Sequence, residues 1–462
     1  PEVLADFING FRKPLPFLSA NLDFSAEPSL QALVDSGRIA PSVVVRERGH
    51  RIGVVGATTP LLPSISSPRG VVVDPDVAAE VQAEVDALEA DGVNKIVLIS
   101  HLQSIEEDRA LALELSGVDI MISGGGGELL ANPGDRIVPG DSVFGGYPQI
   151  ATNADGVLVP IVTTPGDYAY VGRLVAAFNR QGELLRLNLN KSGPKRVSAQ
   201  GPDAVRPDRQ MQRRVVEPVQ EAVAELAANV VATSEVDLDG QRPSVRTRET
   251  NEGNLIADSL LWQAGQLAAE FGVPEPDVAL QNGGGIRNDS IIPAGEITEL
   301  DTFDMVPFAN FVAVVPEVPP DQFKEILENA VSNVENVDGR FAQIAGSSFT
   351  WDANGTPRQL DDEGNVVEPG TRVQEVELDD GTAIVQGGEV VTGAPNIDVA
   401  TIDFLARGGD QYPFGGLPFT SVGVSYQQAL LNYIQQLPGT PLPVISAADY
   451  PEGGEGRITR LN

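Results

Sequence analysis

The chain holds few side chains of the kinds that catalyse reactions. It contains two histidines, His50 and His101, and no cysteine. Thiolate nucleophiles, disulfides and cysteine-ligated zinc are therefore excluded. His101 directly follows the apolar run 95–100, at the kind of strand end where open α/β sheets place their sites. It is a candidate metal ligand, with a packed core position as the equal alternative.

Four consecutive glycines, Gly124 to Gly127, follow the apolar residues 118–122 and precede Glu128. The backbone amides of such a loop can bind an anion. The loop lacks the lysine and the serine or threonine of a phosphate-binding P-loop, so a nucleoside-triphosphatase site is weakly supported. A tight turn, in which the backbone approaches another segment closely, explains the glycines equally well.

A denser polar group lies in the second half of the chain. The apolar residues 278–280 are followed by Gln281, Asn282, three glycines ending at Gly285, Ile286 and Arg287. An amide side chain, bare backbone amides and a guanidinium thus occur within one turn, which suits a small polar ligand. The alternative is a structural signal for the end of a strand.

Two further segments place an aromatic residue beside polar ones. Phe341 stands between Arg340 and Gln343, and Phe404 precedes Asp410 across a double glycine. Two aromatic rings from separate loops can sandwich a planar base, and a carboxylate can then bind a ribose. Each ring could instead belong to the core.

Hydrophobic periodicity predicts the elements that position these residues. The first half alternates short apolar runs, typical of buried strands, with helical segments that carry apolar residues at three-to-four spacing. This succession predicts an α/β fold with a layered sheet and covering helices. The predicted strands are 51–56, 95–100 and 118–122, and the predicted helices are 77–90 and 105–115.

The length of 462 residues predicts two domains. The stretch 192–208, rich in proline and glycine, is the best linker candidate. We therefore expect one domain over residues 1–195, a linker over 196–212 and a second α/β (α+β) domain over 213–462. The second domain should open with a helix over 213–231.

The composition is strongly acidic, with 31 Lys and Arg against 65 Asp and Glu and a net charge of −34. Such a surface repels DNA and RNA, so a nucleic-acid polymer is excluded as a partner. A single nucleotide in a locally positive pocket is not excluded. The sequence contains no apolar run long enough to span a bilayer, and it is silent on oligomeric state.

Several motifs in the second half, taken in order, resemble the 5'-nucleotidase C-terminal domain. They cover more than 200 residues, which makes the resemblance specific. The motifs are residues 248–258, 282–287, 295–298, 306–310, 341–346 and 403–412.

The resemblance implies a pocket for a nucleoside or nucleoside monophosphate. Phe341 and Phe404 would clamp the base, Asn282 would bind it, and Asp410 would bind the ribose hydroxyls. Two arginines, with the Gly285 backbone nearby, would bind the substrate's phosphate or carry positive charge beside it, because guanidinium is permanently charged and forked. Those arginines are Arg248 and Arg287.

The first half resembles the family's metallophosphatase domain incompletely. The family's upstream metal motifs and its catalytic histidine are missing from this chain, so no catalytic residue is assigned. Where the family has Gly-His-x-His, this chain has Gly124 to Gly127. His101 matches a remaining ligand, and Glu128 could supply an oxygen that favours a harder ion such as Mn²⁺, Mg²⁺ or Ca²⁺. The divalent ions expected for the intact protein are Mn²⁺, Zn²⁺, Mg²⁺ or Ca²⁺.

The resemblance implies a divergent 5'-nucleotidase or phosphoesterase that hydrolyses nucleoside phosphates with divalent metal when intact. It also implies an extracellular, cell-surface or periplasmic location. The rival hypothesis is a non-catalytic nucleoside-binding or surface-assembly protein that keeps the scaffold without the metals.

Overall fold

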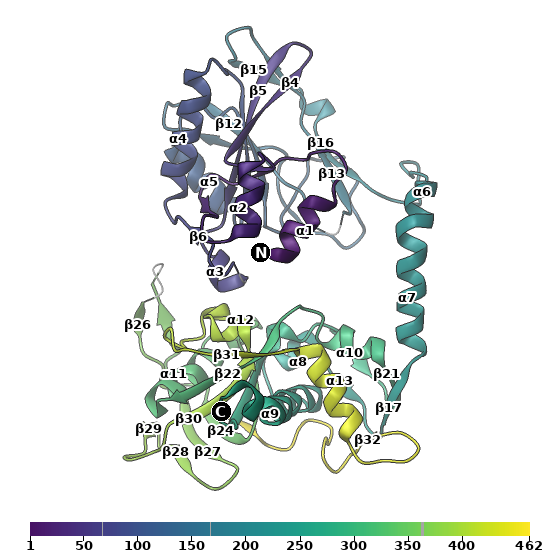
Figure 1. Cartoon of the computed structure of the whole chain (residues 1–462), viewed down its shortest axis with the longest axis vertical. Coiled ribbons are helices and arrows are strands. Elements are labelled where there is room, and N and C mark those ends of the chain that lie inside the picture. The colour runs from purple at the N-terminus through teal and green to yellow at the C-terminus, as the bar shows by residue number, and fades with distance from the viewer. Residues whose placement is uncertain (67, 167, 362–364) are drawn as a thin grey trace. The chain divides into compact units, whose positions relative to one another are not determined.

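In the computed structural model the chain forms two compact units, unit 1 over residues 1–208 and unit 2 over residues 209–462 (Figure 1). The structure describes residues 1–66, 68–166, 168–361 and 365–462. The boundary between the units falls inside the segment 196–212 that the sequence suggests as a linker. In the described part of the chain, no helix is both long and apolar enough to cross a membrane.

Unit 1 is built on a six-stranded sheet with the strand order β11-β12-β8-β7-β5-β4. Neighbours β5, β7, β8 and β12 run parallel, and the two edge strands are antiparallel. Helices α4 and α5 connect the parallel strands, so the predicted β-α-β-α-β succession is confirmed. The bounds are β4 Ser42–Glu47, β5 His50–Thr58, α4 Val77–Ala90, β7 Ile96–His101, α5 Ile105–Glu114, β8 Ile120–Gly124, β11 Gln149–Thr152 and β12 Leu158–Val162.

One face of this sheet is covered by α4 and α5. Each helix begins at a side-chain cap, Asp76 accepting from the Ala79 amide and Ser104 from the Glu107 amide. The apolar stripe of α4 packs on alternate strand residues, so that Val85 joins Leu98 and Met121 in one buried cluster. Alternation along each strand sends the intervening side chains to the other face.

That other face is apolar and only partly covered. Val54, Val97 and Ile120 are paired in register across β5, β7 and β8, and they are half-buried. Farther along, Ile122 remains 45% exposed. Among the described residues, none of these four belongs to a buried hydrophobic cluster. We call this surface the open sheet face.

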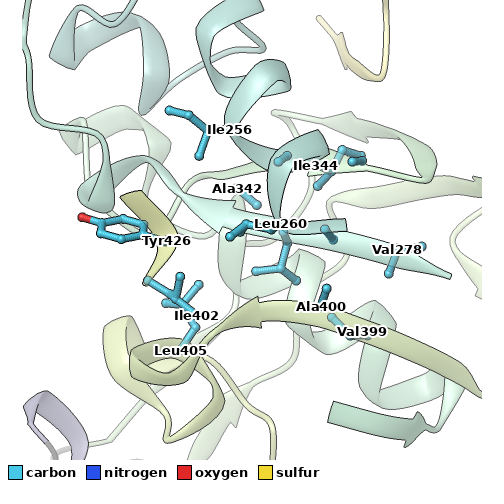
Figure 2. Close-up of a cluster of buried hydrophobic side chains, with 14 of the residues drawn as sticks. Ile256, Leu260, Val278, Ala342, Ile344, Val399, Ala400, Ile402, Leu405 and Tyr426 are labelled. Atoms are coloured by element: carbon cyan, nitrogen blue, oxygen red, sulfur yellow. The ribbon is translucent and has the colours of Figure 1, made fainter. Parts of the chain in front are cut away.

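Unit 2 contains a five-stranded sheet with the order β23-β19-β30-β22-β31, in which β19 and β30 are parallel neighbours. Helix α9 packs on β19 and β23; it begins after the cap Thr250 and ends at left-handed Gly272. Figure 2 shows the core here: Ile256 and Leu260 of α9 lie over side chains from three strands. The bounds are α9 Asn251–Phe271, β19 Val278–Asn282, β22 Phe311–Val318, β23 Ala342–Ala345, β30 Ile397–Ile402, β31 Thr420–Ser425 and α13 Tyr426–Gln436.

The helix expected over 213–231 differs in detail. It starts earlier, at α6 Arg209–Met211, passes through a π-helical turn over Gln212–Val216, and continues as α7 Glu217–Ala228. The wide turn ends two residues before Pro218, whose ring nitrogen has no hydrogen to donate to a helical bond. Val230 and Val231 belong instead to strand β17 Val230–Ser234, which pairs with β21 Gly295–Thr298.

The remaining elements of both units are helices, two-stranded sheets and, in unit 2, the three-stranded sheet β21-β17-β32 and a second five-stranded sheet, β29-β28-β27-β24-β33. In unit 1 they include α1 Glu2–Gly10, α2 Pro28–Asp35, β9 Leu129–Leu130, β13 Tyr170–Arg173, β14 Ala176–Phe178, β15 Leu184–Leu187 and β16 Gly193–Arg196. In unit 2 they include β18 Leu238–Asp239, α8 Arg242–Val245, β20 Ile291–Ile292, α10 Glu299–Met305, α11 Pro320–Ala330, β24 Ser347–Asp352, β27 Val373–Leu378, β28 Ala383–Gln386, β29 Glu389–Val390, α12 Asp403–Ala406, β32 Val444–Ile445 and β33 Ile458–Leu461.

Candidate functional site

The polar residues singled out in unit 2 gather at the carboxyl ends of β19 and β30. Asn282 is the last residue of β19, and the segment from Phe404 to Asp410 follows β30. Because these strands are parallel neighbours, their ends meet at one edge of the sheet. Ligands of α/β sheets bind at such an edge.

A short hydrogen bond joins the two loops. Asn282 Nδ2 donates to Asp410 Oδ2 at 2.6 Å, and Asn329 Nδ2 holds the Asp410 carbonyl at 3.0 Å. Asp410 has a left-handed backbone, with φ of 52°. Burial raises the pKa of the Asp410 carboxyl, against the lowering effects of the Asn282 bond and of Arg340 and Arg246. The structure thus brings Asn282 and Asp410 into direct contact.

Bare backbone is required beside this pair. A Cβ on Gly284 would lie 3.0 Å from Asn282 Nδ2, 3.1 Å from the Gly339 Cα and 3.2 Å from Asp410 Oδ2. The Gly284 amide also donates to the Gly339 carbonyl at 2.7 Å. The glycine run therefore lets three loops converge on the Asn282–Asp410 bond.

The arginine that faces this pair is Arg246, and the predicted phosphate role of Arg248 does not fit the structure. The side chain of Arg248 is 66% exposed and forms an ion pair with Asp239 at 3.1 Å. Arg246 is 7% exposed, its charge interacts with Asp410 and Asp338, and its Nε has no hydrogen-bond partner among the described residues. Burial lowers the pKa of Arg246. A buried guanidinium with a free donor is a natural anion ligand.

One of the two rings predicted to clamp the base is buried in the core. Phe341 is 1% exposed and packs in the core of unit 2, so its ring offers no face to a ligand. Phe404 is half-buried and lies against Gly409, where an added Cβ would be 2.5 Å from the ring. The accessible aromatic missed by sequence reasoning is Phe308, which is 46% exposed.

Phe308 is tied to the glycine loop. Its amide donates to the Tyr426 hydroxyl at 2.9 Å, and that hydroxyl donates to the Gly285 carbonyl at 3.3 Å. The exposed Arg287 guanidinium stacks over the Phe308 ring at 5.4 Å from its centroid. Gly285 and Arg287 therefore belong to the same group of residues as Phe308.

A sequence signal exists for Phe308 but not for Arg246. Phe308 follows Pro307 in a loop and is flanked by Ala309, whereas Phe341 leads directly into the apolar alternation of β23. That context favours exposure for Phe308 and burial for Phe341. Arg246 and Arg248 stand two residues apart in one turn, and only packing of Arg246 beside Gly283 separates them.

The equivalent edge of unit 1 carries little chemistry. His101 ends β7 with an exposed side chain. Glu128 Oε1 accepts the Ile105 amide at 3.2 Å, so this carboxylate caps α5. Beneath it, Asp108 is fully buried and accepts hydroxyl hydrogen bonds from Ser100, at 2.5 Å, and from Ser123. Burial raises the pKa of Asp108 to about 6.

The residues predicted to bind metal do not fit a two-metal centre. Within the described residues, no three His, Cys, Asp or Glu side chains come together to hold an ion. Gly125 has a φ of +94°, and a Cβ there would lie 1.7 Å from the Leu102 carbonyl oxygen. A histidine at this place in the loop would therefore require the backbone to rearrange.

Comparison with known protein families gives a match that lies within unit 2. The family model described as the 5'-nucleotidase C-terminal domain matches residues 230–415. The trifunctional nucleotide phosphoesterase protein YfkN of Bacillus subtilis is 30% identical over 443 residues, which cover 89% of this chain and 27% of that protein. The 5'-nucleotidase of Mus musculus is 29% identical over 350 residues, covering 74% and 57% of the two chains. This chain thus spans only part of these relatives.

Solved structures extend the likeness to both units. A 5'-nucleotidase precursor from Thermus thermophilus is 32% identical, with a TM-score of 0.67 and coverage of 99% of this chain and 80% of that one. A putative 5'-nucleotidase from Staphylococcus aureus shares the fold, with a TM-score of 0.67, at 15% identity. With the C-terminal domain matched and the fold shared over its full length, the chain belongs to the 5'-nucleotidase family, and its first unit is metallophosphatase-like.

Proposed function

We propose that unit 2 binds a nucleoside 5'-monophosphate at the edge formed by β19 and β30. The observation that carries this proposal is the Asn282–Asp410 bond with the buried, incompletely paired Arg246 beside it. The Asp410 carboxylate, the Asn282 amide and the Arg246 guanidinium converge there. The exposed ring of Phe308 and the half-buried ring of Phe404 belong to the adjoining loops. The relatives named 5'-nucleotidase lend this choice of ligand further support.

Each group has a distinct task in this proposal. Asp410 accepts hydrogen bonds from the ribose hydroxyls, because an ionised carboxylate has only acceptor positions. Asn282 orients that carboxylate and offers its oxygen toward the base edge. Phe308 and Phe404 stack on the base, and the phosphate lies toward the cations Arg246 and Arg287.

Isothermal titration of the full chain with AMP tests the proposal, using Arg246→Ala and the matched control Arg248→Ala. We expect Arg246→Ala to weaken AMP binding by about 100-fold, because a charge-assisted pair contributes roughly 1.5–3 kcal/mol. Arg248→Ala should change it by less than about threefold, since an exposed ion pair contributes little. Equal losses in both variants, or no binding by the wild type, would contradict the proposal.

Removal of Arg246 takes away one of the cations that interact with the buried Asp410 carboxyl, so the variant needs a test for folding. Arg246→Lys keeps the charge and loses the forked geometry. It should fold with a melting temperature near that of the wild type and bind AMP with intermediate affinity. A lysine variant that folds normally and binds as tightly as wild type would show that the fork is not used.

Hydrolysis of the phosphate ester is the second candidate, favoured by family membership. Because the donors of unit 1 do not fit a two-metal centre, no step of hydrolysis can be assigned to residues of this chain. Phosphate release from AMP with added Mn²⁺ or Zn²⁺ separates the candidates. Binding without release supports a nucleotide-binding role, and release that Arg246→Ala abolishes supports hydrolysis at this site. The extracellular, cell-surface or periplasmic location stays a prediction.

A further inference from the structure

A buried carboxyl group contacts the loop that carries Arg287. Glu252, in the first turn of α9, has no exposed surface. Its Oε2 accepts a hydrogen bond from Asn288 Nδ2 at 3.1 Å. Its Oε1 and the Asn288 Oδ1 are both buried and have no partner among the described residues. Two orphaned oxygens thus belong to the same pair of side chains.

These two oxygens border the same small space beside Gly240. A Cβ on Gly240 would lie 2.3 Å from Glu252 Oε1 and 2.2 Å from Asn288 Oδ1. Two oxygens that carry only lone pairs repel each other at such a place, and a buried acceptor without a donor costs free energy. One proton on Oε1 removes both problems, because the acid then donates to the amide oxygen. Acid and amide are then joined by two hydrogen bonds.

The charges around Glu252 favour the neutral acid. Asp239, at the end of β18, and Asp301, in the first turn of α10, both face it and disfavour a further negative charge. Arg248 is committed to Asp239, and Asp301 to the capping box of Thr298. Burial, the largest influence, raises the pKa of Glu252 to about 8. The carboxyl is therefore mostly protonated at neutral pH.

The pair fixes the loop that carries Arg287. Asn288 directly follows Arg287, whose amide donates to the Met305 carbonyl at 2.9 Å. The same loop is held at the Asp239–Arg242 turn, where the Gly240 amide donates to the Ser290 carbonyl at 3.1 Å. Beside the loop is a cavity of about 450 Å³ lined by Arg287 and Asn288 among others. With open space beside it, Arg287 is held by these backbone bonds, by the Phe308 ring and by the Asn288 attachment next to it in the chain.

We propose that Glu252 is a positioning residue that, as a neutral acid, closes a two-bond pair with Asn288 and thereby holds Arg287 at the nucleotide site. Ionisation of Glu252 breaks the donated bond and sets a carboxylate against the Asn288 oxygen, so the loop loosens and phosphate binding weakens. The inference about protonation stands on the geometry of the pair, which burial and the neighbouring carboxylates support, and its consequence for binding rests on the proposed function.

The variant Glu252→Gln isolates the proton. Glutamine places an N–H donor where the acid carries its O–H and keeps the acceptor for Asn288 Nδ2, so both bonds persist without titration. The folded-state pKa lies above the ordinary value of 4.5, so stability from the neutral pair is full below pH 4.5 and is lost as pH rises to about 8. We expect the melting temperature of Glu252→Gln to exceed that of wild type increasingly from pH 5 to pH 8.

AMP affinity gives the second measurement. Between pH 7 and pH 9.5 we expect wild-type affinity to fall about tenfold more than that of Glu252→Gln. Above pH 7 the phosphate of AMP is essentially fully ionised, and both proteins experience the same ligand. Glu252→Ala, which removes both bonds, should bind weakly at either pH.

Glu249→Gln is the matched control, three residues away on the same motif. The Glu249 carboxylate accepts the backbone amides of Glu455, Gly456 and Ile458. An amide donor facing those amides should lower the melting temperature at every pH, in contrast to Glu252→Gln.

Three outcomes separate the claims. A Glu252→Gln protein that melts below wild type at pH 8 would overturn the claim that Glu252 is a neutral acid that donates to Asn288. The expected melting behaviour with equal pH dependence of AMP affinity in both proteins would overturn the positioning role. The expected melting behaviour with no AMP binding by either protein would overturn the proposed function and support the acid–amide pair.

Discussion

Each unit places a glycine-rich loop at the carboxyl end of a parallel strand, yet only one loop is surrounded by converging polar groups. Gly283 to Gly285 follow β19 and lie beside Asn282, Asp410 and Arg246. Gly124 to Gly127 adjoin His101 and a glutamate that caps α5. Glycines give the backbone close access, but the side chains at neighbouring strand ends supply the chemistry.

Adding bulk to each loop tests this contrast most strongly. Gly284→Val should abolish AMP binding, by at least roughly 1000-fold or about 4 kcal/mol, because the side chain fills the space beside Asn282 and Asp410. Gly127→Val should leave binding unchanged, since nothing lies within 4 Å of its Cβ position. Titration calorimetry measures both. Normal AMP binding by Gly284→Val would mean that the Gly283–Gly285 loop does not take part in binding.

Histidine substitutions in the Gly124–Gly127 loop of unit 1 test whether backbone geometry excludes side chains there. Gly125→His should destabilise the protein by about 2–5 kcal/mol, from backbone strain and overlap with the Leu102 carbonyl. Gly127→His, at a position without positive φ, should melt near the wild-type temperature. Thermal unfolding followed by circular dichroism compares them. Equal melting temperatures would mean that backbone geometry does not exclude a histidine at residue 125.

The aromatic rings give a smaller effect on the ligand. Phe308→Ala and Phe404→Ala should each weaken adenosine binding by roughly 1–3 kcal/mol, the contribution of one stacked base. Phe341→Ala should instead leave a core cavity, lowering the melting temperature while the folded protein binds adenosine as before. Adenosine titrations and melting curves on all three variants separate the roles. If Phe341→Ala alone lost affinity for adenosine, Phe341 would be a residue that clamps the base, as the sequence predicted.

A titration in unit 1 tests a buried carboxyl that lies outside the candidate site. The Asp119 carboxylate accepts the Ile96 amide at 2.8 Å, and burial, its largest influence, raises its pKa to about 6. Stability contributed by neutral Asp119 is full below pH 3.8 and lost as pH rises to about 6, by at most about 1.4 kcal/mol per pH unit. The Asp119→Asn minus wild-type difference in melting temperature should grow from pH 4 to pH 6 and then stay constant. A melting-temperature difference that stays constant from pH 4 to pH 6 would mean that folding does not raise the pKa of Asp119.

The fold was largely predictable because its signals are local. Apolar residues at helical spacing located α4, and short apolar runs located β7 and β8. The candidate site was predictable only in part: polar residues after a strand end singled out Asn282 and Asp410, which the structure brings into contact. It was not predictable where packing decides between near neighbours, as between Arg246 and Arg248, or where burial removes an aromatic ring, as at Phe341. Glu252 has no sequence signal, because its role depends on Asn288, 36 residues away.

The open sheet face of unit 1 has a consequence for how the protein behaves in concentrated solution. Copies of a chain with net charge −34 repel one another at low ionic strength, where electrostatic range is long. At 1 M salt that range falls to about 3 Å, and excluded salts such as sulfate strengthen apolar association. Ile122 and its apolar neighbours would then meet their counterparts on other molecules. Light scattering should therefore show particle size growing with added sulfate, which makes dilute, low-salt buffer the condition for keeping single chains apart.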